Sequence, residues 1–397
     1  MDSNDFFEHL LELPDLKVLS VEYHPKKIIC YCELKKGSPS CPNCGAPTSV
    51  LNQYKTRKVR DLDISGKEVW FHLRVGQYVC EPCNRYFNQE TDWLLPEKSY
   101  TKRQAKWMFE MCAKQPFSEV GALLNICPKT VERFYYAEAK KRINLPKPYQ
   151  EVQYLGIDEI SHRKGKGDYV CVLVDLEKGI ELDVLPDRKK ASLKAHFEKL
   201  GESFCAQIKV VCCDMWKTYL SIAKECFPNA TTVIDRFHVV KALNEVLDKL
   251  RKKLRREFKQ EDCFKDIKWK LFKRPENCSQ AELDELQNAL TKSWELEEVY
   301  HLRNSFNDIF DIAINQEDCN KQLNYWIGHA QMLNNEPMDK FLKTLKKWQK
   351  QITAFAENRV TNAVTEGLNN YIRYFKRISF GLPNFEHMRL RILMATT

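Results

Sequence analysis

Two acidic residues stand at the ends of apolar segments that are typical of buried strands. Asp158 ends the run YLGID (within residues 152–160), and Asp214 ends the run IKVVCCD (within 208–216). Neighbouring carboxylates repel, so a pair at a core edge is costly unless a cation binds them. Mg²⁺ often combines one or two carboxylates with phosphate oxygens. The acids therefore predict a site for Mg²⁺-dependent phosphoryl transfer. The alternatives are a water-facing strand end at Asp158 and a helix cap at Asp214.

A third acid is expected from a later helix. Glu366 lies in the segment TEGLNNYIRYFKR, which has the pattern of a helix. Asn369, Asn370 and Arg373 follow it at spacings that place all four residues on one helix face. A carboxylate, two amides and a guanidinium make a polar face suited to metal and phosphate, with a solvent-facing polar stripe as the alternative.

Four of the 16 cysteines form two Cys-x-x-Cys pairs, Cys41 with Cys44 and Cys80 with Cys83. Four thiolates in a tetrahedron suit a structural Zn²⁺. The alternating run EVWFHLRVGQYVC predicts a strand that leads into the second pair. A zinc ribbon is the interpretation, and two reduced thiol turns without metal are the alternative. Most of the other cysteines are expected to be small buried apolar side chains.

Residues 101–143 have a helical pattern with one tight turn. Ser118 is expected to cap a short helix, and Pro128 suits the first position of the next helix after a turn at residues 126–127. A short helix, a tight turn and a second helix with polar residues near its start predict a helix-turn-helix that binds DNA. An ordinary helical hairpin is the alternative. The polar front of the second helix consists of Lys129, Thr130 and Arg133.

The segments around the two acids alternate between strand and helix patterns in the order βββαβαβ. The strands are expected at 152–160, 168–176, 180–186, 208–216 and 230–238. This order is that of the ribonuclease H fold, in which the first and fourth strands lie side by side. Asp158 and Asp214 would therefore be neighbours. Residues 239–355 are helical in pattern and predict a helical insertion, with a break at Pro275 and a capping box from Ser279 to Glu282.

The bulk composition indicates a soluble protein with two or three domains. The chain has 397 residues and a formal net charge of +9. It shows no signal-peptide start and no apolar run long enough to cross a bilayer, which predicts a cytoplasmic protein. In residues 249–259, seven of eleven residues are basic and one is acidic. A solvated helix face and a phosphate-facing surface both remain open for this segment.

The motifs together resemble a known family. The segments GIDEISHRKGKGDYVCVLVDLEKGIELDVLPDR, CDMWKTYL, IDRFHVVK and TNAVTEGLNNYIRYFKR look like those of the DDE transposases of bacterial insertion sequences, in particular the ISL-three family. The resemblance covers nearly the whole chain. It implies a multidomain α+β protein with the following parts: a zinc ribbon (1–95), a helix-turn-helix domain (96–147), a ribonuclease H-like α/β catalytic core (150–240), a helical insertion (241–355) and the closing helix of the core (356–397).

The resemblance also implies a mechanism. Asp158, Asp214 and Glu366 would form a triad that binds two Mg²⁺ (or Mn²⁺) ions, with Zn²⁺ structural in the ribbon. Metal-activated water would cleave DNA at the terminal inverted repeats of the element, and the freed 3′-hydroxyl would attack target DNA. Glu159 would point to the opposite face of its strand and be secondary.

Further contacts and partners follow from the same resemblance. The partner would be double-stranded DNA, both element ends and target, bound by a homodimer or larger assembly in the bacterial nucleoid, with no membrane. The alternative is an inactive, sequence-specific DNA-binding regulator derived from a transposase. Beside the helix-turn-helix residues, the DNA-binding candidates are His162, Arg163, Lys164, Asn369, Asn370, Arg373, Lys376 and Arg377.

Overall fold

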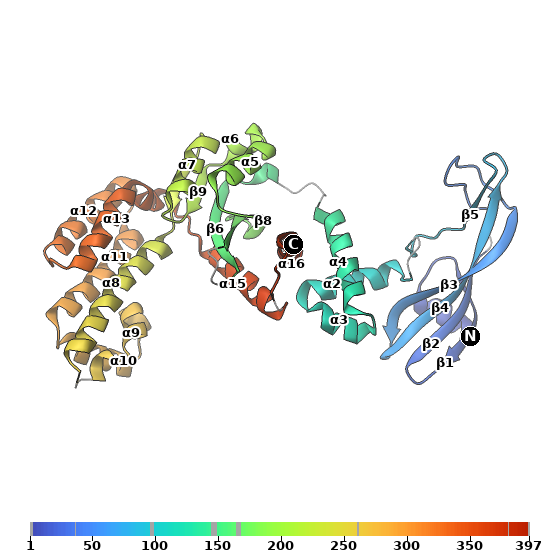
Figure 1. The fold of residues 1–397 in the computed structure, drawn as a ribbon, viewed down its shortest axis with the longest axis horizontal. Helices are drawn as coiled ribbons and strands as arrows, with labels where there is room; N and C mark the ends of the chain where they lie inside the picture. Colours follow the sequence, from blue (N-terminus) through green and yellow to red (C-terminus); the bar gives the residue numbers. More distant parts are fainter. Residues whose placement is uncertain are drawn as a thin grey trace. The chain divides into compact units, whose positions relative to one another are not determined.

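The computed structural model divides the chain into two compact units, Met1–Glu138 and Ala139–Thr397 (Figure 1). Each unit combines helices with one five-stranded sheet, so the chain is a multidomain α+β protein. The structure describes residues 3–35, 37–95, 99–143, 149–163, 168–259, 262–379 and 381–395.

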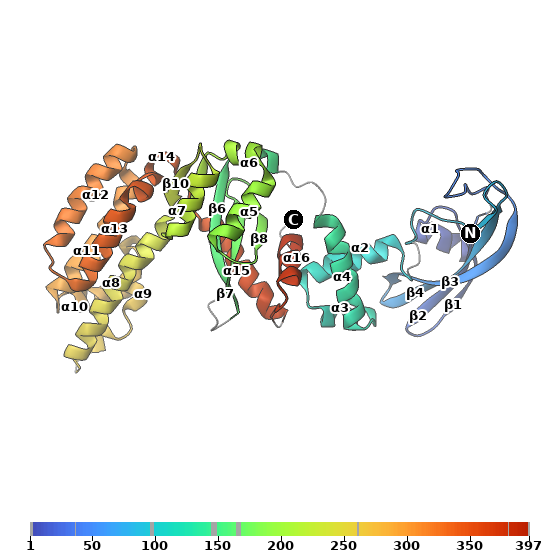
Figure 2. The ribbon, with the colours of Figure 1, turned by 45° about the horizontal axis from the view of Figure 1, so that its top comes forward.

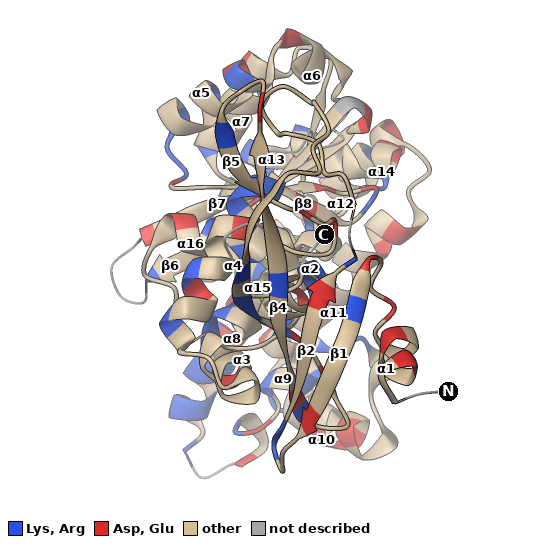
Figure 3. Cartoon of the chain, turned by 90° about the vertical axis from the view of Figure 1, so that its right-hand side faces the viewer, with Lys and Arg blue, Asp and Glu red and all other residues tan. Residues whose placement is uncertain are grey.

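The first unit begins with a helix on a mostly antiparallel sheet. The strands run in the order β1-β2-β4-β3, β5 pairs with β4, and only β2 and β4 pair in parallel. The helix α1 (Ser3–Leu11), whose acidic residues are red in Figure 3, buries Phe7 and Leu11 in the sheet core. The strands are β1 (Leu16–Tyr23), β2 (Lys27–Leu34), β3 (Leu51–Ile64), β4 (Lys67–Cys80) and β5 (Arg85–Asn88). The predicted strand before the second cysteine pair is confirmed.

Two buried charged residues of β3 join this sheet to the helices that follow. Arg60 is only 2% exposed, and its Nη1 donates to the Leu124 carbonyl oxygen at 2.9 Å. Asp61 accepts hydrogen bonds from the Thr101 hydroxyl at 2.7 Å and from the Arg103 guanidinium. Because buried charges must be paired, these contacts fix the helices to the sheet. The helices are α2 (Lys102–Lys114), α3 (Phe117–Leu124) and α4 (Pro128–Ile143).

The turn between α3 and α4 is tight. Asn125 ends α3 in the left-handed conformation, with φ at 52°. A Cβ added to Gly121 would lie 2.7 Å from the Ile126 carbonyl oxygen, so only glycine lets the chain turn back this closely. Pro128 begins α4, as the sequence predicted.

The predicted cap at Ser118 is wrong. α3 begins at Phe117, one residue before Ser118. Pro116 occupies the N-cap position, and no side chain of the described residues caps the helix. The proline ring fixes φ, here −60°, and carries no hydrogen-bond acceptor, so the helix starts without a side-chain cap. Ser118 lies exposed in the first turn of α3.

The second unit contains a mixed sheet in the order β10-β9-β6-β7-β8. Three strands form an antiparallel meander, and β9 and β10 run parallel to β6. The predicted neighbourhood of the first and fourth strands is confirmed, because β6 pairs with β9 and Ile157 lies opposite Cys213. The strands are β6 (Tyr154–Arg163), β7 (Asp168–Asp175), β8 (Ile180–Leu185), β9 (Val210–Cys213) and β10 (Thr231–Ile234).

Helices cover both faces of this sheet (Figures 1 and 2). On one face, Phe197 of α5 (Lys190–Leu200) and Tyr219 of α7 (Lys217–Cys226) belong to the same buried cluster as Leu155 and Ile157 of β6. On the other face, a separate cluster joins side chains of the sheet to those of α15 (Ala363–Ile378) and α16 (Phe385–Ala395). Its members include Ile160, Val172, Val184, Ile372, Phe375 and Met388.

The chain that connects β10 to α15 forms a bundle of helices, as the sequence predicted (Figure 2). The predicted break appears as a short 3₁₀ helix, Pro275–Asn277, and the capping box of Ser279 and Glu282 is present. None of the helices described here is long and apolar enough to span a bilayer. The helices of the bundle are α8 (Arg236–Glu257), α9 (Lys268–Phe272), α10 (Gln280–Leu290), α11 (Trp294–Ile312), α12 (Gln316–Gln331), α13 (Glu336–Thr353) and α14 (Phe355–Asn358). Two 3₁₀ turns, Tyr149–Glu151 and Asp262–Phe264, and the helix α6 (Glu202–Gln207) complete the unit.

The turn after α3 yields a stability prediction. Gly121→Ala should destabilise the first unit by about 1–3 kcal/mol, because the added methyl group meets a backbone oxygen. Ser118→Ala, in the same helix, should change stability by less than about 0.5 kcal/mol, because its hydroxyl caps nothing. Urea unfolding of both variants, followed by circular dichroism, measures the difference. A loss in Ser118→Ala as large as that in Gly121→Ala would contradict this account.

Candidate active site

Two carboxylates meet where β9 ends beside the middle of β6. Asp158 follows Ile157 on β6, and Asp214 follows Cys213, so the parallel register brings the two acids side by side. His238, in the first turn of α8, joins them. The ligand atoms of Asp158, Asp214 and His238 all lie within 4.8 Å of one another. His238 Nε2 is 2.7 Å from Asp214 Oδ1. This group can hold a divalent cation.

The electrostatics of the group reflect its burial. Burial, followed by the charge of Asp214, raises the pKa of Asp158 to about 6. Burial acts to lower the pKa of His238, but the hydrogen bond to Asp214 and the surrounding carboxylates outweigh it and raise this pKa. The two acids therefore favour the protonated form of the His238 imidazole.

Asn369 of α15 completes the surroundings of Asp158. Its side chain is 1% exposed, and its Nδ2 donates a hydrogen bond to Asp158 Oδ2. Its Oδ1 is also buried, and no described residue donates to it. An amide oxygen beside a carboxylate pair is a ligand that Mg²⁺ accepts directly or through water. The residues present therefore fit a hard divalent cation.

Gly156 allows α15 to come this close to β6. A Cβ at this position would lie 2.9 Å from Asn362 Oδ1 and 3.0 Å from Thr365 Oγ1, at the start of α15. Both are well within the separation of ordinary non-bonded atoms. The glycine in YLGIDEI thus sets the approach of the closing helix, a role that the sequence analysis did not assign to it.

Glu366 stands in the first turn of α15, one turn before Asn369. It is half-buried, and its backbone N–H donates to the Asn362 carbonyl oxygen at 2.9 Å. Among the described residues, the metal-binding group comprises Asp158, Asp214 and His238 and does not include Glu366. The structure thus brings two of the three predicted acids together, and the role of Glu366 as a ligand stays a prediction.

Sequence reasoning left the roles of Asp235 and His238 unassigned. Asp235 is 4% exposed and caps α8, and its Oδ1 accepts hydrogen bonds from the backbone N–H groups of Phe237 at 3.3 Å and Asn362 at 3.4 Å. Burial raises the pKa of Asp235. The only sequence signal was the run IDRFH, in which an acid and a histidine three residues apart follow a strand.

Glu159 faces away from the carboxylate pair, as strand alternation predicted. It forms an ion pair with Arg188 and accepts a hydrogen bond from the Tyr219 hydroxyl at 3.3 Å. The two adjacent acids of YLGIDEI therefore have separate surroundings. Asp158 belongs to the candidate metal site, and Glu159 to the α7 side of the sheet.

Several predicted DNA-binding residues tie the end of β6 to the closing helices. His162 has a buried side chain and is hydrogen-bonded to the Leu382 carbonyl oxygen at 2.9 Å, and Arg163 donates to that of Pro383 at 2.9 Å. Lys376 donates to the Ser161 carbonyl oxygen at 2.6 Å. DNA contacts by these residues stay predictions. Lys164 lies outside the described residues.

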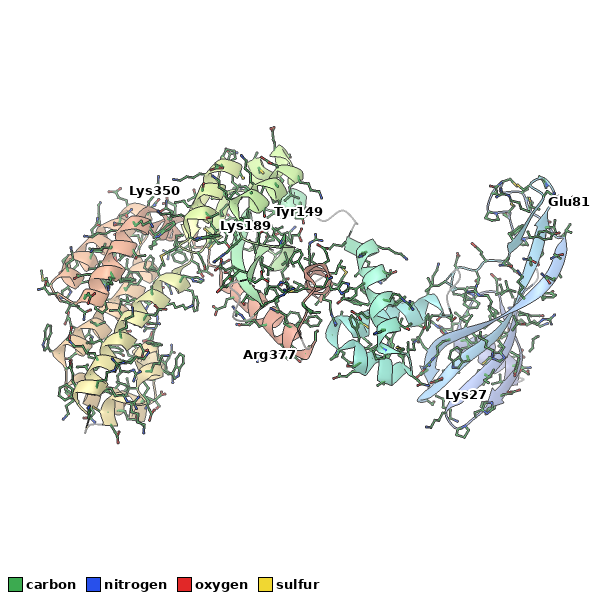
Figure 4. All side chains as sticks on the ribbon, in the orientation of Figure 1. Lys27, Glu81, Tyr149, Lys189, Lys350 and Arg377 are labelled. Atoms are coloured by element: carbon green, nitrogen blue, oxygen red, sulfur yellow. The ribbon has the colours of Figure 1, made fainter. Side chains whose placement is uncertain are left out.

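The polar face of α15 is divided between the protein interior and the surface. Asn369 points to Asp158, whereas Asn370 and Arg373 are exposed and hydrogen-bonded to each other at 2.7 Å. Arg377, labelled in Figure 4, is exposed near the C-terminal end of the helix. The exposed residues are accessible to a phosphate backbone, and Asn369 serves the candidate metal site.

The four cysteines of the first unit form a second metal-binding group. The sulfur atoms of Cys41, Cys44, Cys80 and Cys83 lie within 4.8 Å of one another. Glu81, labelled in Figure 4, lies between the second pair at the end of the β3–β4 hairpin. Four converging thiols in two tight turns are the donor set of a structural zinc site.

The two cysteine turns share a backbone conformation. Gly45 and Asn84, each directly after a Cys-x-x-Cys pair, have φ values of 74° and 49°. Backbone N–H groups of Asn43 and Cys44 lower the pKa of the Cys41 thiol to about 7. Such donors favour a thiolate, the form that binds a metal.

The predicted polar front of α4 lies on its outer side. Lys129 and Arg133 are exposed and Thr130 is half-buried, whereas Val131 and Tyr135 pack inside the first unit. The three residues are available to a partner, and DNA binding by them stays a prediction.

Comparisons with known proteins match the segments that contain these two sites. A family model described as a transposase, that of the DDE transposases of the ISL-three type, matches residues 155–392. A second model, described as the zinc-finger of transposase IS204/IS1001/IS1096/IS1165, matches residues 37–83. The transposase for insertion sequence element IS1001 of Bordetella parapertussis is 26% identical over 360 residues, which are 89% of this chain and 88% of the relative.

A fold with paired carboxylates at adjacent parallel strands, matched over more than half of the chain by one family model, defines a transposase. The chain belongs to the ISL-three transposase family, and its N-terminal cysteine group forms the zinc ribbon of that family.

The zinc group yields a metal-content prediction. The purified protein should hold about one Zn²⁺ per chain, and Cys80→Ser should lose it because three thiolates remain. Elemental analysis measures the zinc content. Cys127→Ser changes an exposed cysteine outside the group and should keep the zinc. Full zinc content in Cys80→Ser would show that the group is not the zinc site.

The carboxylate pair predicts a stability gain on charge removal. In EDTA at pH 8, Asp158→Asn should be more stable than the wild type by about 1–3 kcal/mol, because a buried repulsion disappears. Mn²⁺ should raise the melting temperature of the wild type and not that of the variant. Thermal unfolding with and without Mn²⁺ measures both effects.

The adjacent acid serves as the matched control. Glu159→Gln breaks the ion pair with Arg188 on the other face, so it should destabilise the protein and leave its response to Mn²⁺ intact. Equal stabilisation by both variants would contradict the assignment of Asp158 to a repulsive pair.

Proposed function

We propose that the chain is a divalent-metal-dependent DNA transposase, which cleaves DNA at the terminal inverted repeats of its element and joins the ends to target DNA. The observation that carries the proposal is the meeting of Asp158, on β6, and Asp214, directly after the paired strand β9. Family membership supports it. The strand order β10-β9-β6-β7-β8, with helices on both faces, supports a ribonuclease H-like catalytic core.

The proposed catalytic residues are Asp158, Asp214 and Glu366. The bound ions, two Mg²⁺ or Mn²⁺, would activate the attacking hydroxyl and stabilise the leaving oxygen. Asn369 orients Asp158 through its amide N–H, and His238 holds Asp214 through Nε2. Positioned ligands of this kind supply geometry, which is the main need of phosphoryl transfer.

Glu366 is proposed as the third ligand because of its place on α15. It lies one helical turn before Asn369, and residues three apart share a helix face. Asn369 already touches Asp158. The same helix presents Asn370, Arg373 and Arg377 to solvent, where they can bind the phosphates of the DNA strand.

The first unit is proposed to recognise the element ends. α3, the tight turn and α4 form a helix-turn-helix in this proposal, with α4 as the recognition helix. Lys129, Thr130 and Arg133 near its start would contact DNA. The zinc ribbon stiffens the end of the long β3–β4 hairpin. Because two element ends must be held together, the active assembly is proposed to contain at least two chains in the nucleoid.

Cleavage and strand transfer test this function. The protein is mixed with DNA carrying the ends of its own element, in Mg²⁺ or EDTA. Nicked and joined products should form in Mg²⁺, and Asp214→Asn and Glu366→Gln should each lower the rate by at least about 10³-fold, because a metal ligand is lost. Glu159→Gln, beside the site, should retain most of the activity.

The outcomes separate the proposal from its alternative. If the wild type binds the ends and forms no product with Mg²⁺ or Mn²⁺, the chain is a DNA-binding regulator instead. If Asp214→Asn cleaves as fast as the wild type, the assignment of the carboxylate pair fails. If only Glu366→Gln stays active, the third ligand lies elsewhere, with His238 the next candidate.

A further inference from the structure

An open groove runs along α8, directly after the candidate active site. It encloses about 400 Å³ between α8 and α9 and is mainly apolar. That volume lies in the range of pockets for small organic groups, about 300–1,000 Å³. The groove is lined by Phe237, Val240, Lys241, Asn244, Glu245, Asp248, Lys268, Trp269 and Phe272.

Two of the lining aromatic side chains are exposed to solvent. Trp269 is 68% exposed and Phe237 is 46% exposed. Trp269 meets Phe272 edge to face, with ring centroids 5.7 Å apart, and the Lys268 ammonium lies 4.6 Å from the Trp269 ring centroid. An indole ring held by such neighbours, with its surface open to water, offers a stacking platform at little entropic cost.

The groove starts at the metal-binding group. Phe237 precedes His238 in α8, and their ring centroids are 5.5 Å apart. The lining residues of α8 run from Phe237 to Asp248. At 1.5 Å per residue this distance is roughly 16 Å, or about five nucleotides of a stacked strand at 3.4 Å each. A DNA strand leaving the site along α8 therefore reaches the groove within a few nucleotides.

A basic surface continues from the groove along the same helix. A second hollow on α8 is lined by Lys249, Lys252, Lys253 and Arg256 together with Glu257. These four basic residues are exposed, so the run at 249–259 forms a solvent-facing cationic strip. Arg251 does not belong to it, because this residue is buried and bonded to Asp248 at 2.8 Å and to the Phe264 carbonyl oxygen at 2.7 Å.

The charges of the groove itself favour a base over a phosphate. Asp248 is neutralised by Arg251 and Lys252, each at 2.8 Å. Glu245 is exposed in the lining and would repel a phosphate group inside the groove. A strand can place its backbone on the cationic strip and a base against Trp269. Exocyclic amines of a base that carries them can donate to the Glu245 carboxylate.

We propose that this groove binds an unpaired nucleobase of the DNA strand that leaves the active site, with Trp269 as the stacking platform. The strip of Lys249, Lys252, Lys253 and Arg256 binds the backbone of the same strand. The substrate is thus DNA with a single-stranded segment beside the cut. This inference deepens the proposed function and rests on it.

Binding without cleavage tests the groove separately from catalysis. The probes are fluorescently labelled dT20 and a 20-residue abasic oligonucleotide, which keeps the phosphates and lacks the bases. Anisotropy titrations of the full chain are made in EDTA. Trp269→Ala should weaken binding of dT20 by about tenfold, since stacking contributes about 1–3 kcal/mol per base. It should leave the abasic probe unaffected, and Trp269→Phe should restore most of the affinity.

Trp294 provides the matched control. It is 70% exposed, on α11 and outside the groove, so Trp294→Ala should bind both probes as the wild type does. Lys253→Ala with Arg256→Ala should weaken both probes equally and flatten the salt dependence. Equal dT20 affinity in Trp269→Ala and the wild type would overturn the proposal. Loss of self-association in Trp269→Ala, with dT20 binding unchanged, would overturn it in favour of a groove that binds a second chain.

A failed cleavage assay has a different meaning from a failed binding assay. If the element ends are not cut but dT20 binding depends on Trp269, the groove stands and the catalytic proposal fails. If the ends are cut but Trp269→Ala binds dT20 normally, the catalytic proposal stands and the groove is assigned wrongly.

Discussion

The parallel pairing of β6 with β9 imposes the constraint on which the site depends. It places Asp158 and Asp214 side by side at two inner strands of a buried sheet, where two like charges are costly. Two neighbouring polar groups reduce that cost. His238 brings an imidazole against Asp214, and Asn369 donates an amide hydrogen to Asp158. A divalent cation would offset this repulsion more fully than either group, so the repulsion between the two acids and their capacity to bind metal have one origin.

The same constraint explains how a long helical bundle can interrupt the core. Asp235, at the start of α8, accepts a hydrogen bond from the backbone N–H of Asn362, at the start of α15, across 127 positions of sequence. The two helices that complete the site are thereby held together at their first turns. Gly156 has no side chain to meet Asn362 and Thr365, so the start of α15 can pack closely against β6. The bundle between them can then extend outward, and α8 carries the aromatic groove and the cationic strip away from the acids.

The first unit is held together in a different way. Its sheet and the helices that follow are joined by buried charged residues. Arg60 and Asp61 of β3 fix α2 and α3 through carbonyl, hydroxyl and guanidinium contacts. Beyond them the β3–β4 hairpin carries the two cysteine turns, where zinc supplies the stability that little apolar burial can provide. A long hairpin stiffened at both ends, one by buried ion pairs and the other by metal, suits a unit that presents α4 to a partner.

The sequence by itself determined the elements and the chemistry of the donors. Cys-x-x-Cys spacing identified the zinc ligands, strand alternation separated Asp158 from Glu159, and the βββαβαβ order predicted which strands are neighbours, because these signals are local or follow simple packing rules. The tertiary structure alone decided the rest. His238 and Asn369 converge on the acids from helices more than a hundred residues apart, and His162 turns inward to a carbonyl oxygen of the closing segment. Spacing cannot predict such contacts, because the approach of packed helices, set here by the missing side chain of Gly156, fixes which groups meet.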